Sequence, residues 1–275
     1  MSLLLKPAEV VKKTLATVED VDFDLPEGSD WKREGYAVVV GISEYLRMRG
    51  PAYASRDAEA IVKYLVRVVG IPEKNIKLLL DEEATYSTVE AYITKFLAKK
   101  KGLKVFYFAG HGLSPDDPSE EDAYLLACDC DPDLLSGALS LRRIKETLGS
   151  SGDTTLVLID ACYSGGGEGR TPLVARRGIK IEPRIPVVER VYVITGAKGT
   201  QPSLDFETAK HGYFTYYLLL GLKGKADGAG GNKVDGVITM GELFTFVKER
   251  VENGTNGRQI PVMEGDGGFV VGKCR

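Results

Sequence analysis

The sequence is short of several residue types, and each shortage excludes a class of protein. Among its 275 residues there are two histidines, four cysteines and one tryptophan. Four cysteines are too few for a disulfide scaffold, which indicates a reducing compartment. No apolar run approaches the roughly 18 residues of a membrane span, and the three leucines before Lys6 are far shorter than a secretory signal. We therefore predict a cytoplasmic protein with no membrane partner.

An excess of charge of one sign is also missing. The chain has 36 lysines and arginines against 39 aspartates and glutamates, a net charge of −3. Such a balance leaves no strongly basic surface for a phosphate backbone, so we expect no nucleic-acid partner. There are only two glutamines and four asparagines. A shortage of thermolabile amides, together with abundant lysine and glutamate, is typical of a thermophilic source.

From residue 36 onward, short apolar runs alternate with helical patterns. The runs predict strands at 36–42, 76–80, 104–110, 154–160 and 190–196, with an edge strand or hairpin at 123–129. Helical spacing of apolar residues predicts helices at 55–69, 85–101, 140–148, 209–222 and 239–251. This alternation predicts an α/β fold with a mostly parallel sheet between two helical layers, and a ligand site beyond the carboxyl ends of the strands. We interpret residues 1–34 as an N-terminal extension or pro-segment and residues 35–275 as one domain.

Two chemically reactive residues follow predicted strands directly. His111 comes after the strand at 104–110, between two glycines, and Cys162 comes after the strand at 154–160. Because the carboxyl ends of parallel strands meet at one edge of a sheet, we expect the imidazole and the thiol to lie close together. In such a pair the imidazole balances the thiol proton, the thiolate attacks a carbonyl carbon, and the imidazole later protonates the leaving amine. The backbone N–H groups of Gly112 and Cys162 are candidate donors to the oxyanion.

These motifs resemble the caspase-like cysteine peptidases of clan CD, family C14, in which a histidine lies about 50 residues before the cysteine. Here His111 and Cys162 are 51 residues apart. The segments YAVVVGISEY, SRDAEAI and HGYFTYYLLLGLKGKAD are also similar to that family. Animal caspases have Gln-Ala-Cys at the nucleophile, whereas this chain has Asp160-Ala161-Cys162, which resembles metacaspases and their prokaryotic relatives, the orthocaspases. The resemblance implies a caspase-like three-layer fold and cysteine endopeptidase activity.

The resemblance also implies a substrate preference. In metacaspases the acid two residues before the cysteine and an acid in the first helix line the S1 pocket, and the matching residues here are Asp160 and Asp57. Two carboxylates in one pocket favour arginine or lysine at P1 through charge-assisted hydrogen bonds. The expected partners are therefore protein or peptide substrates with a basic P1 residue, and we expect the chain to act as a monomer. The predicted loop at 195–206 leaves its strand at the same edge and is a further candidate for substrate contacts.

The segment that follows Cys162 predicts self-processing. Residues 166–186 form a glycine- and proline-bearing loop that carries several arginines, beside the expected acidic pocket. We predict cleavage after Arg176 or Arg177 within this loop, as related enzymes mature by cutting a linker after the catalytic strand. The N-terminal extension has two interpretations. Its Lys12, Lys13, Lys32 and Arg33 suit an inhibitory peptide lying across an acidic groove, or the extension is a strap on the outer surface.

Plainer interpretations stand beside these. Asp160 can cap the turn after its strand, and Asp57 can be a favourable acid near a helix N-terminus. For His211, which precedes a helical pattern, a capping or surface role is the main expectation. Cys128 and Cys130 form a C-x-C pair with no histidine near, so we expect them to be structural or inert, and Cys274 to be incidental.

No cofactor or metal is required by the predicted reaction. The acidic residues 116–122, with Asp129, Asp131 and Glu168, are a candidate site for calcium as an activator, and a solvated acidic face is the alternative. A function of another class is a catalytically silent caspase-like module that binds a protein partner in the same groove. A nucleotide-binding domain is disfavoured, because the sequence has neither a complete glycine-rich fingerprint nor a Walker sequence.

Overall fold

The computed structural model describes residues 18–26, 31–113, 122–131, 134, 136–162, 188–198 and 201–274. The strands are β1 (Gly35–Gly41), β2 (Ile76–Leu80), β3 (Leu103–Leu113), β4 (Tyr124–Asp131), β5 (Ser136–Ser140), β6 (Thr155–Cys162), β7 (Val191–Thr195), β8 (Asp205–Phe206), β9 (His211–Gly212), β10 (Val237–Thr239), β11 (Val262–Glu264) and β12 (Val270–Lys273). The helices are α1 (Ala54–Tyr64), α2 (Tyr86–Ala91), α3 (Leu141–Gly149), α4 (Tyr213–Leu220) and α5 (Met240–Gly254).

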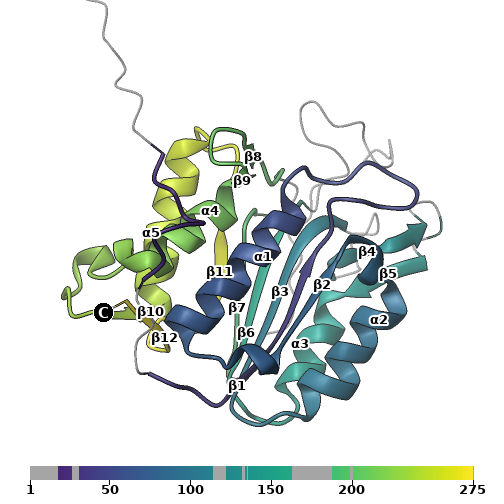
Figure 1. Cartoon of the computed structure of the whole chain (residues 1–275), viewed down its shortest axis with the longest axis horizontal. Coiled ribbons are helices and arrows are strands. Elements are labelled where there is room, and N and C mark those ends of the chain that lie inside the picture. Colours follow the sequence, from purple (N-terminus) through teal and green to yellow (C-terminus); the bar gives the residue numbers. More distant parts are fainter. Residues whose placement is uncertain are drawn as a thin grey trace, which may run out of the picture.

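The centre of the molecule is a mostly parallel sheet. Its strands run in the order β11-β7-β6-β3-β1-β2, and β4 and β5 extend it from the end of β3. The five predicted strands are all present and pair in parallel, while β11 is antiparallel to β7. Helices α1, α4 and α5 lie on one side of the sheet, and α2 and α3 lie on the other (Figure 1). The predicted three-layer α/β fold is therefore confirmed.

The strands are apolar on both faces because both faces are covered. In β1 and β3, alternate residues enter two separate hydrophobic clusters, one under each helical layer. The layer of α1, α4 and α5 packs on Ala37, Val39, Val105 and Tyr107, and the layer of α2 and α3 packs on Val38, Val40, Phe106 and Phe108. Each buried valine or phenylalanine among them contributes about 1.5–3 kcal/mol by its removal from water. The buried strands therefore hold their carboxyl ends rigidly in register.

One helix, α4, begins four residues after the predicted position, whereas α5 begins where the pattern predicts. The helix predicted from 209 begins at Tyr213, because His211 and Gly212 pair with Phe206 and Asp205 as the two-stranded ladder β8–β9. Lys210 has a positive φ of 56°, which closes this tight turn. Helix α5 follows the predicted pattern and begins with a capping box, in which Thr239 accepts from the backbone of Glu242 and donates to its carboxylate.

The described part of the N-terminal extension, residues 18–26, lies against α1 and α4, and we call it the N-terminal strap. Figure 1 shows it in purple beside α4. Its Val21 is buried, and the carbonyl of Val21 accepts a hydrogen bond of 3.0 Å from the Tyr64 hydroxyl. The carbonyl of Glu19 accepts from the Tyr216 hydroxyl at 3.1 Å. The strap thus joins the two helices through backbone groups.

Lys32 and Arg33 do not lie in a groove at the carboxyl edge of the sheet. Arg33 lies two residues before the start of β1, its backbone N–H donates to the carbonyl of Gly70, and its guanidinium donates to the carbonyl of Val270 at 2.8 Å. The amino ends of the strands lie here, on the opposite edge from His111. These two charges are therefore unavailable for an inhibitory peptide at the carboxyl edge, and Lys12 and Lys13 lie outside the described residues.

Candidate active site

His111 and Cys162 lie on neighbouring strands at the carboxyl edge of the sheet. Strands β3 and β6 pair in parallel, and His111 is directly opposite Cys162 in their register. Adjacent strands are about 4.8 Å apart, so the two backbones are immediate neighbours. The side chain of Cys162 and residues 163–187 lie outside the described part of the chain, as do the predicted processing sites Arg176 and Arg177. The sequence prediction that β3 and β6 deliver a histidine and a cysteine to one edge agrees with this register.

The imidazole of His111 is oriented by a backbone carbonyl. His111 is 6% exposed, and its Nε2 is 2.7 Å from the carbonyl oxygen of Arg49. A carbonyl only accepts, so Nε2 carries the hydrogen, and a neutral ring then has its lone pair on Nδ1. A general base needs that lone pair, because it must take a proton from a nucleophile. Arg49 supplies its backbone rather than its side chain, which leaves no signal in the sequence.

Tyr45 is a second support of His111 that sequence reasoning missed. Its hydroxyl accepts from the backbone N–H of His111 at 2.7 Å and donates to the carbonyl of Leu126 at 3.2 Å. Its ring lies 4.9 Å from the imidazole, centre to centre. Tyr45 belongs to the connection after β1, at the edge where the fold predicts a site. Gly112, the candidate oxyanion donor, lies one residue beyond His111 in β3, opposite Leu125 of β4.

Asp57 and Asp160 lie in one pocket at this edge, although they are about a hundred residues apart in the sequence. Asp57 comes from the first turn of α1 and Asp160 from β6, two residues before Cys162. Pro51, Ala54, Gly110, Ser203, Leu204, Asp205 and Gly212 complete the lining. A methyl group added to Gly212 would lie 2.5 Å from Asp160 Oδ2 and 3.2 Å from Asp57 Oδ2. Both carboxylates therefore face the same backbone atom.

Each carboxylate is held by several donors. Asp160 accepts from the Ser203 hydroxyl, from the Thr215 hydroxyl at 2.6 Å and from the Thr215 backbone at 3.2 Å. Asp57 accepts from Nδ1 of His211 at 2.6 Å and from the backbone of Gly212 at 3.0 Å. Among the described residues, neither carboxylate has a lysine or arginine partner. These contacts fix the positions of both carboxylates, and through Gly212 and Thr215 both also accept from the backbone at the start of α4.

Burial dominates the electrostatics of the pocket. Asp57 and Asp160 are only 2% and 7% exposed. Burial raises the pKa of Asp57 to about 7, while the hydrogen bond from His211 opposes that rise and the charge of Asp160 adds to it. Burial also raises the pKa of Asp160, against the hydrogen bonds from Ser203 and Thr215. A cation in the pocket would relieve the cost of ionising both acids.

His211 does not lie on the surface, so that expectation is wrong. Its side chain is 1% exposed, because the β8–β9 ladder turns it inward against α1. Besides the contact with Asp57, its Nε2 is 3.4 Å from Oδ1 of Asp22 in the N-terminal strap. The sequence pattern predicted a helix from 209 and did not predict the β8–β9 ladder. Without that ladder, His211 was expected to be accessible at the start of the helix.

The predicted substrate-contacting loop at 195–206 supplies three residues of the pocket, Ser203, Leu204 and Asp205. The loop is held by Gln259, which is completely buried. The amide of Gln259 donates to the carbonyl of Gly196 at 2.9 Å and to the Ser203 hydroxyl at 3.2 Å, and it accepts from the Leu204 backbone at 2.9 Å. Asp205 thus brings a third carboxylate to the rim.

The remaining predicted features lie elsewhere. Residues 116–121 and Glu168 of the candidate calcium site lie outside the described residues. Asp129 accepts from the backbone of Tyr86, and Asp131 pairs with Arg47. Within the described ranges, no group of three or more acidic, histidine or cysteine side chains is arranged to hold a metal. Cys128 and Cys130 are buried and free of disulfides, and Cys274 is partly buried. No helix in the described part of the chain is long and apolar enough to span a membrane.

Comparison with known proteins agrees with this geometry. The sequence profile of the caspase domain family, Peptidase C14, matches residues 34–266. The chain belongs to the caspase domain family. A probable protease of a Desulfuromonadales bacterium is 28% identical over 245 residues, which are 79% of this chain. The chain spans only 30% of the length of that relative.

The fold has a counterpart among solved structures. The crystal structure of a protein from Geobacter sulfurreducens superposes with a TM-score of 0.56 at 18% identity, over 84% of this chain and 92% of that one. At this identity the likeness concerns the fold alone. Family membership makes this chain a caspase-like peptidase domain, and it fits the register that pairs a histidine with a cysteine.

Proposed function

We propose that the chain is a cysteine endopeptidase that cleaves peptide bonds after arginine or lysine, with Cys162 as nucleophile and His111 as general base and acid. One observation supports the basic P1 preference above others. Asp57 and Asp160 are buried in one pocket without a lysine or arginine partner among the described residues, and this pocket includes Gly110, the neighbour of His111. Burying two carboxylates side by side without a lysine or arginine is costly when both are ionised, so the pocket is suited to a cationic ligand.

The chemistry follows from the positions on β3 and β6. Nδ1 of His111 takes the proton of the Cys162 thiol, and the sulfur attacks the carbonyl carbon of the P1 residue. The N–H groups of Gly112 and Cys162 are the proposed donors to the resulting oxyanion. The tetrahedral species collapses, the C–N bond breaks, and His111 gives its proton to the leaving amine. Water then attacks the thioester, with His111 again as base, which releases the acid and restores the thiol.

The pocket supplies specificity by charge rather than by size. A guanidinium or ammonium group that enters it meets Asp57 and Asp160, with Asp205 at its lining. Charge-assisted hydrogen bonds to carboxylates are about twice as strong as neutral ones. An acidic P1 side chain would instead add a further negative charge beside at least two carboxylates. Cleavage after aspartate is therefore disfavoured.

Peptides that end in arginine, lysine or aspartate before a fluorogenic leaving group test this function, with and without calcium. The wild type, Cys162→Ala, Asp57→Asn and Asp160→Asn are compared, and Asp153→Asn, an acid on the amino edge, is the matched control. We expect cleavage after arginine and lysine that is lost in Cys162→Ala, is weakened by either pocket substitution and is unchanged in the control. Cleavage after aspartate would contradict the assigned pocket. No cleavage in any condition would favour the silent binding module.

Self-processing in the loop 166–186 is part of the same proposal. Arg176 and Arg177 supply the basic P1 residue that the pocket favours. Mass spectrometry of the incubated chain should show two fragments that arise by cleavage after one of these residues. The same incubation of Cys162→Ala should leave one intact chain. An intact wild-type chain in a preparation that cleaves peptides would exclude self-processing there.

A further inference from the structure

We propose that His211 is a positioning residue for the recognition of basic P1 side chains: it fixes the carboxylate of Asp57 and ties it to the N-terminal strap through Asp22. Because the pocket concerned is the one proposed to hold P1, this role rests on the proposed function. His211 does not itself line the pocket, but its Nδ1 contacts Asp57, which does. It acts through the carboxylate that it holds.

His211 lies between a carboxylate of the pocket and a carboxylate of the strap. Its Nδ1 is hydrogen-bonded to Asp57 at 2.6 Å. Its Nε2 is 3.4 Å from Oδ1 of Asp22 and makes no hydrogen bond to any described residue. Asp22 is thus the nearest described carboxylate on the side of the ring away from Asp57. The side chain of His211 is 1% exposed, so water does not compete for these contacts.

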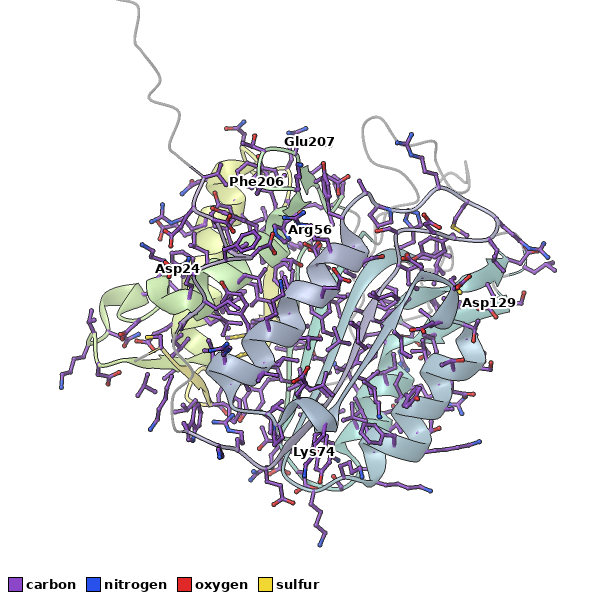
Figure 2. The ribbon with its side chains drawn as sticks, in the orientation of Figure 1. Asp24, Arg56, Lys74, Asp129, Phe206 and Glu207 are labelled. Atoms are coloured by element: carbon purple, nitrogen blue, oxygen red, sulfur yellow. The ribbon has the colours of Figure 1, made fainter. Side chains whose placement is uncertain are left out.

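Ion pairs and hydrogen bonds hold the strap, and with it Asp22, against the rest of the molecule. Arg56, which precedes Asp57 in α1, forms an ion pair with Asp22. Lys223 and Lys225, which follow α4, pair with Glu19 at 3.6 and 3.1 Å, and Lys223 also donates to the carbonyl of Asp20 at 2.8 Å. Figure 2 shows Arg56 at the start of α1, on the same side of the molecule as Phe206 and Glu207 next to the β8–β9 turn. The strap is therefore paired with α1, which carries Asp57, and with the segment that follows α4.

Several titratable and charged groups surround Asp57. The titratable and charged groups around it are Arg56 of α1, Asp22 of the strap, His211 of β9, Asp160 of β6, Asp205 of β8 and Tyr107 of β3. Burial raises the pKa of Asp57 to about 7, and His211 lowers it from a still higher value. Loss of the His211 contact therefore leaves Asp57 protonated near neutral pH. A protonated Asp57 attracts a basic P1 side chain less.

Two substitutions of His211 separate positioning from folding. The amide nitrogen of asparagine lies near the place of Nδ1, whereas that of glutamine lies near the place of Nε2. His211→Asn can still donate to Asp57, and we expect a KM for arginine peptides within about twofold of wild type. In His211→Gln the midpoint of 1/KM against pH should move up by about one pH unit, which raises KM about fivefold at pH 7. The kcat should be the same in both variants.

A purely structural role predicts a different pattern. Equal losses in His211→Asn and His211→Gln, or a fall in kcat at unchanged KM, would overturn the positioning role. A second readout needs no substrate: the ¹³Cγ signal of Asp57 is titrated by NMR in the Cys162→Ala chain and assigned by its loss in Asp57→Asn. We expect its midpoint to rise in His211→Gln, and an unchanged midpoint would overturn the role even if the wild type cleaves after arginine.

The link to the strap has its own matched pair. Asp22→Asn and Glu19→Gln each remove one negative charge from the strap, but only Asp22 faces His211. Asp22→Asn should raise KM for arginine peptides in the same direction as His211→Gln and by less, whereas Glu19→Gln should leave it unchanged. Equal effects of the two would overturn the link. Absence of cleavage by the wild type would instead overturn the proposed function, and with it the specificity role, whatever the NMR titration shows.

Discussion

Asp57 should make the chain less stable as the pH rises, and replacement by asparagine should remove that dependence. The folded chain raises the pKa of Asp57 from 3.8 to about 7 because the carboxyl group is buried. Each pH unit of difference corresponds to 1.36 kcal/mol, so ionised Asp57 is held at a cost of about 4 kcal/mol. Between pH 4 and 7 the unfolded chain releases this proton and the folded chain keeps it. Stability therefore falls with rising pH in that window and levels off above it.

Guanidinium chloride unfolding at pH 4 to 8 measures this effect. The Cys162→Ala chain is the reference, since it excludes self-cleavage, and Asp57→Asn is made in that background. Only the pH-dependent part of the difference between the two curves is read. We expect the free energy of unfolding of Asp57→Asn to gain on the reference by up to about 4 kcal/mol between pH 4 and 8.

Asp153, whose pKa is shifted in the opposite direction to that of Asp57, provides the control. Asp153 is partly exposed, and its hydrogen bond with Ser151 lowers its pKa. Its carboxylate stabilises the folded chain above its ordinary pKa, and this contribution is lost as the pH falls. Asp153→Asn should therefore not gain on the reference as the pH rises. A difference between Asp57→Asn and the reference that is independent of pH would refute the reasoning from burial. Such a result would mean that the folded chain holds Asp57 with no electrostatic cost.

Three further substitutions test the geometry. Tyr45→Phe leaves the buried N–H of His111 without its acceptor. We expect the free energy of unfolding to fall by about 1–3 kcal/mol in chemical unfolding, and kcat to be lower. Unchanged values of both would show that the hydroxyl is dispensable. Gly212→Ala places a methyl group 2.5 Å from Oδ2 of Asp160. Peptide kinetics should therefore show a higher KM for arginine substrates. A KM equal to that of the wild type would contradict the described pocket. Thr239→Ala removes the cap of α5. Chemical unfolding should show a free energy of unfolding lower by about 1 kcal/mol, and peptidase activity should be unchanged. A shift in KM would contradict this expectation.

Much of the fold could be predicted because it depends on local patterns. Continuous apolar runs predicted the five parallel strands, and the order of elements predicted a layer of helices on each face. The position of His111 after one strand and Cys162 after another predicted their common edge, since parallel strands end together. The strand boundaries agree within two or three residues because burial on both faces decides where a run ends. The acidic pocket was assigned by resemblance to metacaspases, and its residues do lie together.

Contacts between distant parts of the chain could not be predicted. Asp57 and His211 are 154 residues apart, and a short ladder, β8–β9, replaces the first turn of the predicted helix to bring them together. The carbonyl of Arg49 orients His111, and a backbone carbonyl is the same in every residue. Gln259 looks like an ordinary polar residue until its burial against the 195–206 loop is known.

The sequence by itself thus determined the strands of the sheet, its edges and the placement of a histidine and a cysteine at the ends of two of those strands. Hydrophobic periodicity and the order of the strands can both be read directly along the chain. Only the tertiary structure decided how the pocket is charged. Burial, the absence of a lysine or arginine partner among the described residues, and the position of His211 between Asp57 and Asp22 arise when separate segments pack together. The pKa of a carboxyl group depends on that packing, and no local pattern of residues records it.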